Sequence, residues 1–427
     1  MKESQQTGFG LVSLSCLVVA NTIGAGVYTT SGFTLGDIGS RWGVLAIWAA
    51  ASLLALTGAV SFGALARAVP KSGGEYLYLS RLLHPSAGFI AGWVSLIAAF
   101  AGAEAYAAIT LKEYLSLDHL PHVEQAIAVG LLVVLGLLQG VLVKLGTTLQ
   151  NLTVLAKAGF ILLFVILGGS LLQAPTDLPA SSPASLWVWP VNLMWVSLSF
   201  TGFNSAIYVA EECQNPVRDI PRALLIGTVV TALLYLAINA VFVFSAPIEQ
   251  LAGHPDIALR SANALGGPAL RTAVQGLVLL SLFTLISGMA VAGPRVVVKM
   301  GEDGYLPPLS LTQAALVQCT LAVIMTLQAS LVDQLTYLSL TLSLTSALTV
   351  ATVFKLKKEQ QPHPIFPTVY LLGTLLSAVA SLKILPGAGL AALATITSGG
   401  LVYALFFRGK ENNRREHPPG PEEAKSD

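Results

Sequence analysis

The chain has 427 residues, of which 54% are hydrophobic and only 11% are charged, and its formal net charge is +1. A soluble globular protein carries about 25% charged residues, so this composition and a mean hydropathy of +0.72 exclude that class. The net charge favours no nucleic-acid partner, and a lipid bilayer is the expected environment.

Apolar runs of about 18 or more residues are typical of membrane-spanning helices. The chain contains twelve such runs, so we predict twelve spans. Their approximate bounds are residues 10–33, 43–66, 87–114, 124–143, 149–173, 189–211, 222–246, 269–299, 311–330, 334–354, 365–385 and 388–407.

Two of these spans, the first and the sixth, contain interruptions. Residues 21–26 read Asn-Thr-Ile-Gly-Ala-Gly, and residues 199–204 read Ser-Phe-Thr-Gly-Phe-Asn. Glycines lower helix stability and leave the backbone uncrowded. Backbone freed from helical pairing in hydrocarbon must be buried in protein or line a polar cavity. Paired interruptions in the two halves of a chain predict the binding site of a secondary transporter.

The two interrupted spans open two five-span units, residues 10–173 and 189–354, and residues 365–407 add two further spans. Because five is odd, the second unit enters the membrane from the opposite side. This predicts an inverted repeat of the leucine-transporter type. The predicted fold is therefore an all-α, multi-span membrane protein with twelve transmembrane helices, the first and sixth of them discontinuous.

The lysine and arginine positions predict the orientation. With both termini in the cytoplasm, 17 of the 23 lie in inner segments and 5 in outer ones, which leaves Lys157 within a span. Cytoplasmic loops carry such an excess of positive charge. We expect a multi-pass protein of the cell membrane, plasma or inner. Residues 1–9 form its cytoplasmic N-terminus, and the charged, proline-rich residues 408–427 form a disordered cytoplasmic tail.

Several motifs follow one another in the order known from one family. They lie at residues 21–28, 70–76 (Pro-Lys-Ser-Gly-Gly-Glu-Tyr), 201–204, 211–222 and 293–307. Over about residues 10–310 they resemble the amino acid–polyamine–organocation superfamily, and they have some character of its L-type, neutral amino acid branch. The resemblance implies a transporter and no enzyme, with no catalytic residue, metal or cofactor beyond a coupling proton.

The broken spans offer backbone groups to an α-amino acid. The N–H groups of residues 25–27 begin a half-helix, whose positive end suits a carboxylate. Free carbonyl groups at the other half-helix ends suit an ammonium group, so one site with both features selects a zwitterion. The alternative is that the glycines only allow close helix packing. The predicted backbone site comprises Thr22, Ile23, Gly24, Ala25, Gly26, Val27, Leu198, Phe200, Thr201 and Gly202.

Asn204 is the predicted determinant of side-chain preference. It falls where many relatives carry a carboxylate, so the resemblance implies neutral amino acids. A cationic side chain at this place would leave its charge poorly compensated in a low dielectric. Phe203 and Met289 are candidates for the pocket wall, and ordinary bundle packing explains each equally well.

Lys157 and Glu104 are the predicted coupling residues. Lys157 lies about 12 Å into the fifth span at 1.5 Å per residue, and a charge there is costly unless it is paired or hydrated. The resemblance implies that its ammonium takes the place of a sodium ion. It either titrates, or stays charged as a fixed substitute, or reaches the inner interface. Glu104 is a second protonation site, a substrate contact, or a protonated carboxyl bonded to a neighbouring helix.

Glu211 and Glu212 end the sixth span and are predicted to form a cytoplasmic gate with Arg67, Arg218 or Arg295. The predicted function is secondary active transport of small, neutral L-amino acids by alternating access, with proton symport. The alternative is an uncoupled, obligatory exchanger. A membrane-embedded enzyme is remote because no histidine lies within any predicted span, and a sensor is remote because the short tail offers no expected signalling domain. The amino acid and the bilayer are the expected partners, and no obligatory subunit is evident.

Overall fold

The computed structural model describes residues 9–115, 117, 119–138, 156–172, 185–302, 304 and 306–406. In this part of the chain, the regular structure is helical apart from one bridge between Phe9 and Cys213. Eight helices are long and apolar enough to cross a membrane, or nine if one bent pair counts as a single span. Three shorter apolar helices overlap parts of the predicted fourth, fifth and sixth spans. The count of twelve stays a prediction, and the predicted tail lies outside the described residues.

The described helices fall into two halves of the chain. Those of the first half are α1 (Leu11–Thr22), α2 (Gly26–Ile38), α3 (Arg41–Ala68), α4 (Gly74–Leu82), α5 (Pro85–Val94), the π-helix η1 (Ser95–Gly102), α6 (Ala103–Leu115), α7 (Pro121–Leu137) and the helix Ala156–Leu171. Those of the second half are α9 (Val188–Leu198), the 3-10 helix η2 (Ser205–Glu212), α10 (Pro216–Phe244), α11 (Ile248–Leu251), α12 (Ile257–Glu302), α13 (Leu311–Gln328), α14 (Leu331–Ala351), η3 (Thr352–Lys355), η4 (Lys358–Gln360), α15 (Ile365–Ile384) and α16 (Pro386–Phe406).

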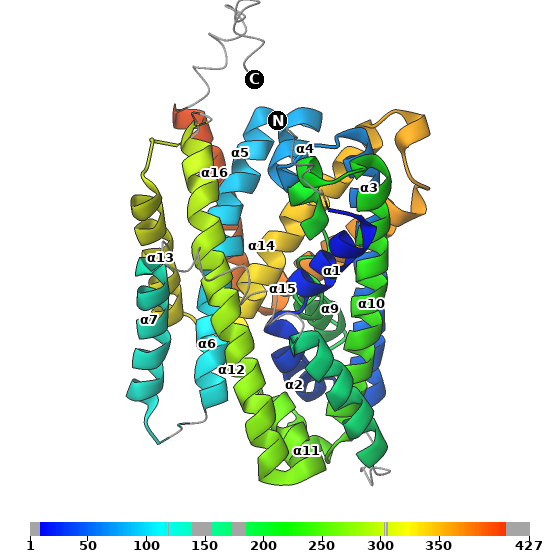
Figure 1. Ribbon diagram of the computed structural model, residues 1–427, viewed down its shortest axis with the longest axis vertical. Coiled ribbons are helices and arrows are strands. Elements are labelled where there is room, and N and C mark those ends of the chain that lie inside the picture. Colours follow the sequence, from blue (N-terminus) through cyan, green and yellow to red (C-terminus); the bar gives the residue numbers. More distant parts are fainter. Residues whose placement is uncertain are drawn as a thin grey trace, which may run out of the picture.

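Most helices run lengthwise through one bundle (Figure 1). Helices α7 and α13 pack together on one side, and α3 packs along α10 on the other, while α12 crosses between them and contacts α6. Helix α4 and the last turn of α16 lie at one end of the bundle, which we call the terminal end. The short helix α11 lies at the opposite end, which we call the α11 end.

Local sequence explains several helix boundaries. Ser310 accepts the Gln313 N–H while the Gln313 side chain bonds the Ser310 N–H, which is a capping box at the start of α13. Pro216 occupies the first turn of α10, where a missing N–H costs nothing. Within α12, Gly266 and Gly267 have non-helical dihedral angles, so the helix bends just before the predicted span 269–299.

Both predicted interruptions are present as breaks. Helices α1 and α2 are bent by 48° across residues 23–25, and we call residues 21–26 the first break. Helix α9 ends at Leu198 and η2 begins at Ser205, so residues 199–204 form the second break. Gly202 there has a φ of 109°, in the region that glycine tolerates best.

Candidate functional site

The two breaks are in direct contact at the centre of the bundle. A Cβ atom placed on Gly26 would overlap the Ser199 side chain, and a Cβ atom placed on Gly202 would overlap the backbone oxygen of Asn21. Gly26 and Gly202 therefore serve close packing between the breaks, as small residues do in membrane proteins. Gly24 is different, because its nearest neighbour across the packing is Leu285 Cδ1 at 3.8 Å from such a Cβ. Gly24 thus has the more open backbone.

Tyr235 on α10 holds the carbonyl ends of both broken helices. Its hydroxyl donates to the Thr22 oxygen at 2.7 Å and to the Ser199 oxygen at 3.1 Å. The ring packs edge-on against Phe200 and Trp48, with centroid separations of 5.1 and 5.4 Å. The Thr22 carbonyl was predicted as a substrate acceptor, and one of its two lone pairs is used here.

Tyr235 was missed from the sequence because it lies in an unbroken apolar run of α10, far from either motif. A buried tyrosine hydroxyl normally has a hydrogen-bond partner. The residue type was therefore the only local indication that Tyr235 contacts another segment. Its partner Thr22 lies 213 positions away along the chain, and its partner Ser199 lies 36 positions away. Its contact with both breaks makes it a part of the site.

The start of α2 is the donor side of the first break. Ala25 caps this helix without a side-chain hydrogen bond, and the Tyr28 N–H donates to the Ala25 oxygen at 3.1 Å. The Thr30 hydroxyl donates to the Gly26 oxygen at 2.7 Å. The first N–H groups of a helix have no partner within it. The donor role of residues 25–27 toward a carboxylate stays a prediction.

A pocket borders the second break on the terminal side. It has an empty volume of about 790 Å³, part of it open to solvent. Residues 200–204 line it together with residues of α3, η1, α14 and α15, whereas the predicted residues 22–27, Leu198 and Met289 do not. Its apolar walls include Leu54, Phe200 and Phe203. Its polar lining consists of Glu75, Ser95, Ser197, Thr201, Asn204, Tyr208, Ser343, Thr345, Ser346, Tyr370 and Thr374.

Glu75 at the start of α4 is the acidic group of this pocket. Its Oε1 accepts a short hydrogen bond from the Ser346 hydroxyl and a longer one from Asn204 Nδ2 at 3.4 Å. Burial raises the pKa of Glu75 to about 7, and the hydrogen bond from Ser346 opposes this rise. Glu75 was not predicted as a site residue from the sequence and was included only in the 70–76 motif. A single acid between two predicted spans is normally a loop residue.

Glu104 and Lys157 lie apart from this pocket. Gln318 Nε2 on α13 donates to Glu104 Oε1 at 2.8 Å and to the Met289 oxygen at 2.9 Å. Glu104 is thus a buried carboxyl bonded to a neighbouring helix, and its protonation and role stay predictions. Lys157 is buried at the start of the helix Ala156–Leu171. Its coupling role and its depth in the membrane stay predictions.

Glu211 and Glu212 are exposed at the terminal end. In the part of the chain that the structure covers, no ion pair joins either of them to Arg67, Arg218 or Arg295, and Arg218 instead lies 3.9 Å from Asp219. The predicted gate pairs are therefore not formed in this structure.

Backbone contacts hold this part of the terminal end instead. The Glu211 N–H donates to the Ser72 hydroxyl at 3.1 Å. The Phe9 N–H donates to the Glu212 oxygen at 2.9 Å, and the Gln214 N–H donates to the Phe9 oxygen at 3.3 Å. The segment before α1 is thus tied to the end of η2.

The α11 end is closed by tight contacts. The Gly253 N–H donates to the Gly32 oxygen at 2.8 Å, and a Cβ atom on Gly32 would overlap the backbone oxygen of His254. Tyr114 also donates to the Tyr28 backbone oxygen at 2.8 Å. The loop that contains α11 therefore packs directly on α2.

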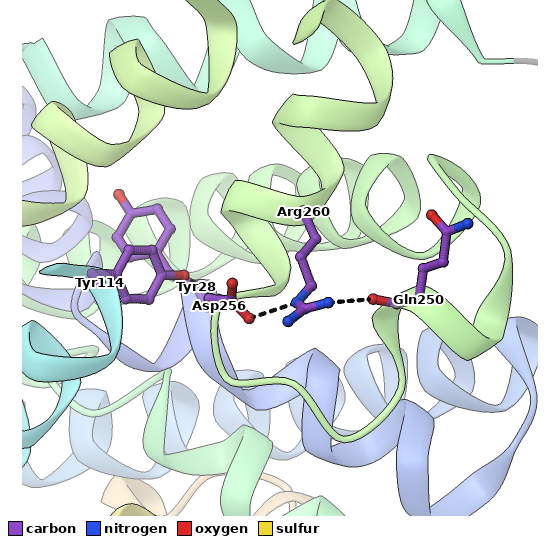
Figure 2. A network of polar contacts seen from close by, with 5 residues as sticks. All are labelled: Tyr28, Tyr114, Gln250, Asp256 and Arg260. Atoms are coloured by element: carbon purple, nitrogen blue, oxygen red, sulfur yellow. Dashed lines mark hydrogen bonds and ion pairs between the residues drawn. The ribbon is translucent and has the colours of Figure 1, made fainter. Parts of the chain in front are cut away.

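A polar network holds this loop in shape. Figure 2 shows Arg260 between the Asp256 carboxylate, 2.7 Å from its Nε, and the Gln250 backbone oxygen, 3.2 Å from its guanidinium. Tyr28 and Tyr114 lie next to Asp256 in the same view. The network links α11 to the start of α12.

The known proteins that resemble this chain are amino acid permeases and transporters. Residues 9–408 match the family model described as amino acid permease. The mouse b(0,+)-type amino acid transporter 1 is 27% identical over 318 residues, which cover 71% of this chain and 64% of the relative. The human large neutral amino acids transporter small subunit 2 is 25% identical over 420 residues, which cover 90% of this chain and 78% of the relative. The chain thus spans about two thirds of the length of the mouse relative.

Proposed function

Because the chain belongs to the amino acid permease family, a family of transporters and not of enzymes, we propose that it carries neutral L-amino acids across the membrane by alternating access. The observation that supports this best is the meeting of the two breaks at Tyr235, beside the pocket. Unwound backbone at the middle of a bundle is where secondary transporters bind their substrates.

The amino acid binds beside the contact of the two breaks, next to the more open backbone of Gly24. Its carboxylate takes the N–H groups at the start of α2, because a helix N-terminus is electropositive. Its ammonium group takes carbonyl oxygens of Thr22 and of the second break, including those of Phe200 and Thr201. The Thr22 and Phe200 oxygens each already accept one hydrogen bond and offer their second lone pair. Its side chain extends past the second break into the pocket, between Phe200 and Phe203. Asn204 provides a polar but uncharged contact there, which favours neutral side chains.

The two ends of the bundle open in turn. With the termini in the cytoplasm, the pocket leads toward the cytoplasmic side, and the α11 end is the closed, outer side. Breaks divide α1 from α2 and α9 from η2, so the halves of each span can tilt without moving as one rod. The tie between Phe9 and the end of η2 makes α1 and η2 move together at the terminal end.

We propose proton symport as the energy source, with Lys157 as one coupling group. The alternative is obligatory exchange with Lys157 as a fixed positive charge. Purified protein in liposomes separates the two with radiolabelled L-leucine as the probe. Symport predicts accumulation in empty vesicles when the outside is acid, whereas exchange requires vesicles preloaded with amino acid.

Lys157→Ala tests the coupling role, with the exposed Lys358→Ala as its control. We expect Lys157→Ala to abolish acid-driven accumulation and Lys358→Ala to retain it. Accumulation by Lys157→Ala at the wild-type level would reject the coupling role.

The human relative is named as a small subunit, which describes a chain that assembles with another. We propose that the present chain transports by itself. The same liposomes test this, because they contain no second protein. A thermal-shift screen against the twenty amino acids then identifies the preferred substrate, and the absence of both shift and transport would contradict the proposed function.

A further inference from the structure

Glu75 joins three parts of the chain at the terminal side of the pocket. It begins α4, and its Oε1 accepts hydrogen bonds from Ser346 on α14 and from Asn204 in the second break. The turn before it is held closely, because a Cβ atom on Gly74 would overlap the ring of Tyr208 on η2. Movement of α4 away from α14 or from the second break would therefore break the bonds to Glu75.

Only one of the two carboxyl oxygens of Glu75 is used. Among the residues that the structure describes, Oε2 has no hydrogen-bond partner. Glu75 is half-buried, and its exposed surface belongs to the wall of the pocket. The free oxygen is thus available for a proton.

Among the residues that the structure describes, no positive charge acts on Glu75 to hold it ionised. Of the helices packed on α4, α14 has only the acid Asp333 as a charged residue, and η2 has only Glu211 and Glu212. Tyr208 on η2 and Tyr370 on α15 act on it electrostatically, and both are neutral phenols near pH 7. Helix α5, which packs on α4, has no acid or base between Pro85 and Val94. The only charged side chain of η3, Lys355, is exposed. An ionised carboxylate without a partner is costly inside a protein.

We propose that Glu75 is a proton-binding site of the pocket and that its neutral form latches α4 to α14 and to the second break. In the neutral form, Oε1 accepts the bonds from Ser346 and Asn204 while Oε2 carries the proton. Loss of the proton to water leaves an unpaired negative charge in the pocket wall. The charge is relieved when water or a cation enters, which separates α4 from its neighbours and opens the terminal side. That this opening serves transport rests on the proposed function.

The pKa of Glu75, which burial raises to about 7, places this change within the physiological range. The carboxyl is neutral below this pH in the folded protein, whereas in the unfolded chain it ionises at its ordinary value near 4.5. The folded state therefore binds a proton that the unfolded state releases between these two values. It follows that the contribution of Glu75 to stability is lost as the pH rises from 4.5 toward 7.

Glu75→Gln is the central test, because an amide resembles the neutral acid and does not titrate. Exchange of L-leucine between preloaded liposomes, with equal pH on both sides, removes any driving force from a proton gradient. We expect the wild-type exchange rate to rise with pH around a midpoint near 7, and Glu75→Gln to stay at the slow, acid-side rate throughout. Glu359→Gln, at an exposed acid on η4, should follow the wild type. A Glu75→Gln profile like that of the wild type would overturn the proposal.

Ser346→Ala provides a second test that a merely structural contact would not pass. The Ser346 hydrogen bond stabilises the ionised form, so its removal raises the pKa of Glu75. We expect the midpoint of exchange to move to a higher pH, and the acid-side rate to rise because the latch has lost one of its two hydrogen bonds. An unchanged midpoint, or one at lower pH, would overturn the proposal.

The melting temperature between pH 4.5 and 8 tests proton binding without transport. It should fall over this range less in Glu75→Gln than in the wild type and in Glu359→Gln. Equal falls in all three would overturn the latch. Failure of the proposed transport function would look different, because no amino acid would then shift the melting temperature or exchange at any pH.

Discussion

The two ends of the bundle are closed in different ways. At the α11 end, Gly32 and Gly36 on α2 pack directly against the backbone of residues 252–254, with no room for a side chain. At the terminal end, the second break, α14 and α4 meet around a pocket, and two hydrogen bonds to Glu75 join them. Backbone contact gives a tight seal that is insensitive to pH, whereas a carboxyl gives a weak contact that a proton controls.

This difference suggests which end opens first from the present conformation. Close-packed backbone has little free space and is nearly incompressible. The segments at the α11 end therefore cannot shift gradually, and all their contacts must separate together. A contact made of one or two hydrogen bonds is worth only about 0.5–1.5 kcal/mol each. The terminal end is thus the end that opens more readily. The following predictions test the contrast, from the largest expected effect to the smallest.

Gly202→Ala should have the largest effect, because both ends depend on contact between the two breaks. The new Cβ atom would overlap the Asn21 oxygen, and the φ of 109° disfavours any side chain. Overpacking costs about 1–3 kcal/mol, and a left-handed backbone conformation adds roughly 1–2 kcal/mol. We expect a large fall in melting temperature and loss of transport. Retention of both would mean that the breaks do not touch as described.

Gly32→Ala should weaken the α11 end specifically. Its Cβ atom would overlap the His254 oxygen, so the loop must move away from α2 at a cost of about 1–3 kcal/mol. We expect slower exchange and a lower melting temperature. Gly276→Ala is the matched control, since a Cβ atom at this position on α12 meets nothing within 4 Å. Equal behaviour of the two variants would contradict a seal at Gly32.

Tyr235→Phe should weaken the centre while leaving both ends intact. The change removes one hydroxyl from the Thr22 and Ser199 oxygens, and buried groups that lose a partner cost about 1–3 kcal/mol. We expect weaker amino acid binding in thermal-shift titrations. Tyr337→Phe removes a hydroxyl that bonds Thr395, away from the breaks, and should bind like the wild type. If both variants bind equally well, Tyr235 does not organise the site.

Asn204→Asp should have the smallest effect. It should change which amino acid side chains are preferred and leave the transport cycle intact. An added carboxylate in the pocket favours cationic side chains, while its closeness to Glu75 disfavours a second negative charge. We expect L-lysine to compete better against L-leucine uptake than it does in the wild type. No shift in this competition would place Asn204 outside the side-chain site.

The sequence by itself determined the helices and the places where they break. Long apolar runs must be helical in a bilayer, and glycines at residues 24, 26 and 202 weaken the helix where they stand, whatever surrounds them. The motifs at residues 21–28 and 201–204 therefore indicated the family, and residues 200–204 do line the pocket. These properties are local, which is why one sequence was enough to predict them.

Only the tertiary structure decided which groups meet. Glu75 and Ser346 are separated by 271 positions, and Glu104 and Gln318 by 214. Tyr235 reaches the first break across 213 positions, and Glu211 forms none of the predicted pairs with arginines that the structure describes. Polar side chains in a bundle bond whichever donors or acceptors the packing brings within about 3 Å. Position along the chain does not indicate which side chains the packing brings together. Glu75 and Tyr235 could therefore be identified as site residues only from the tertiary structure.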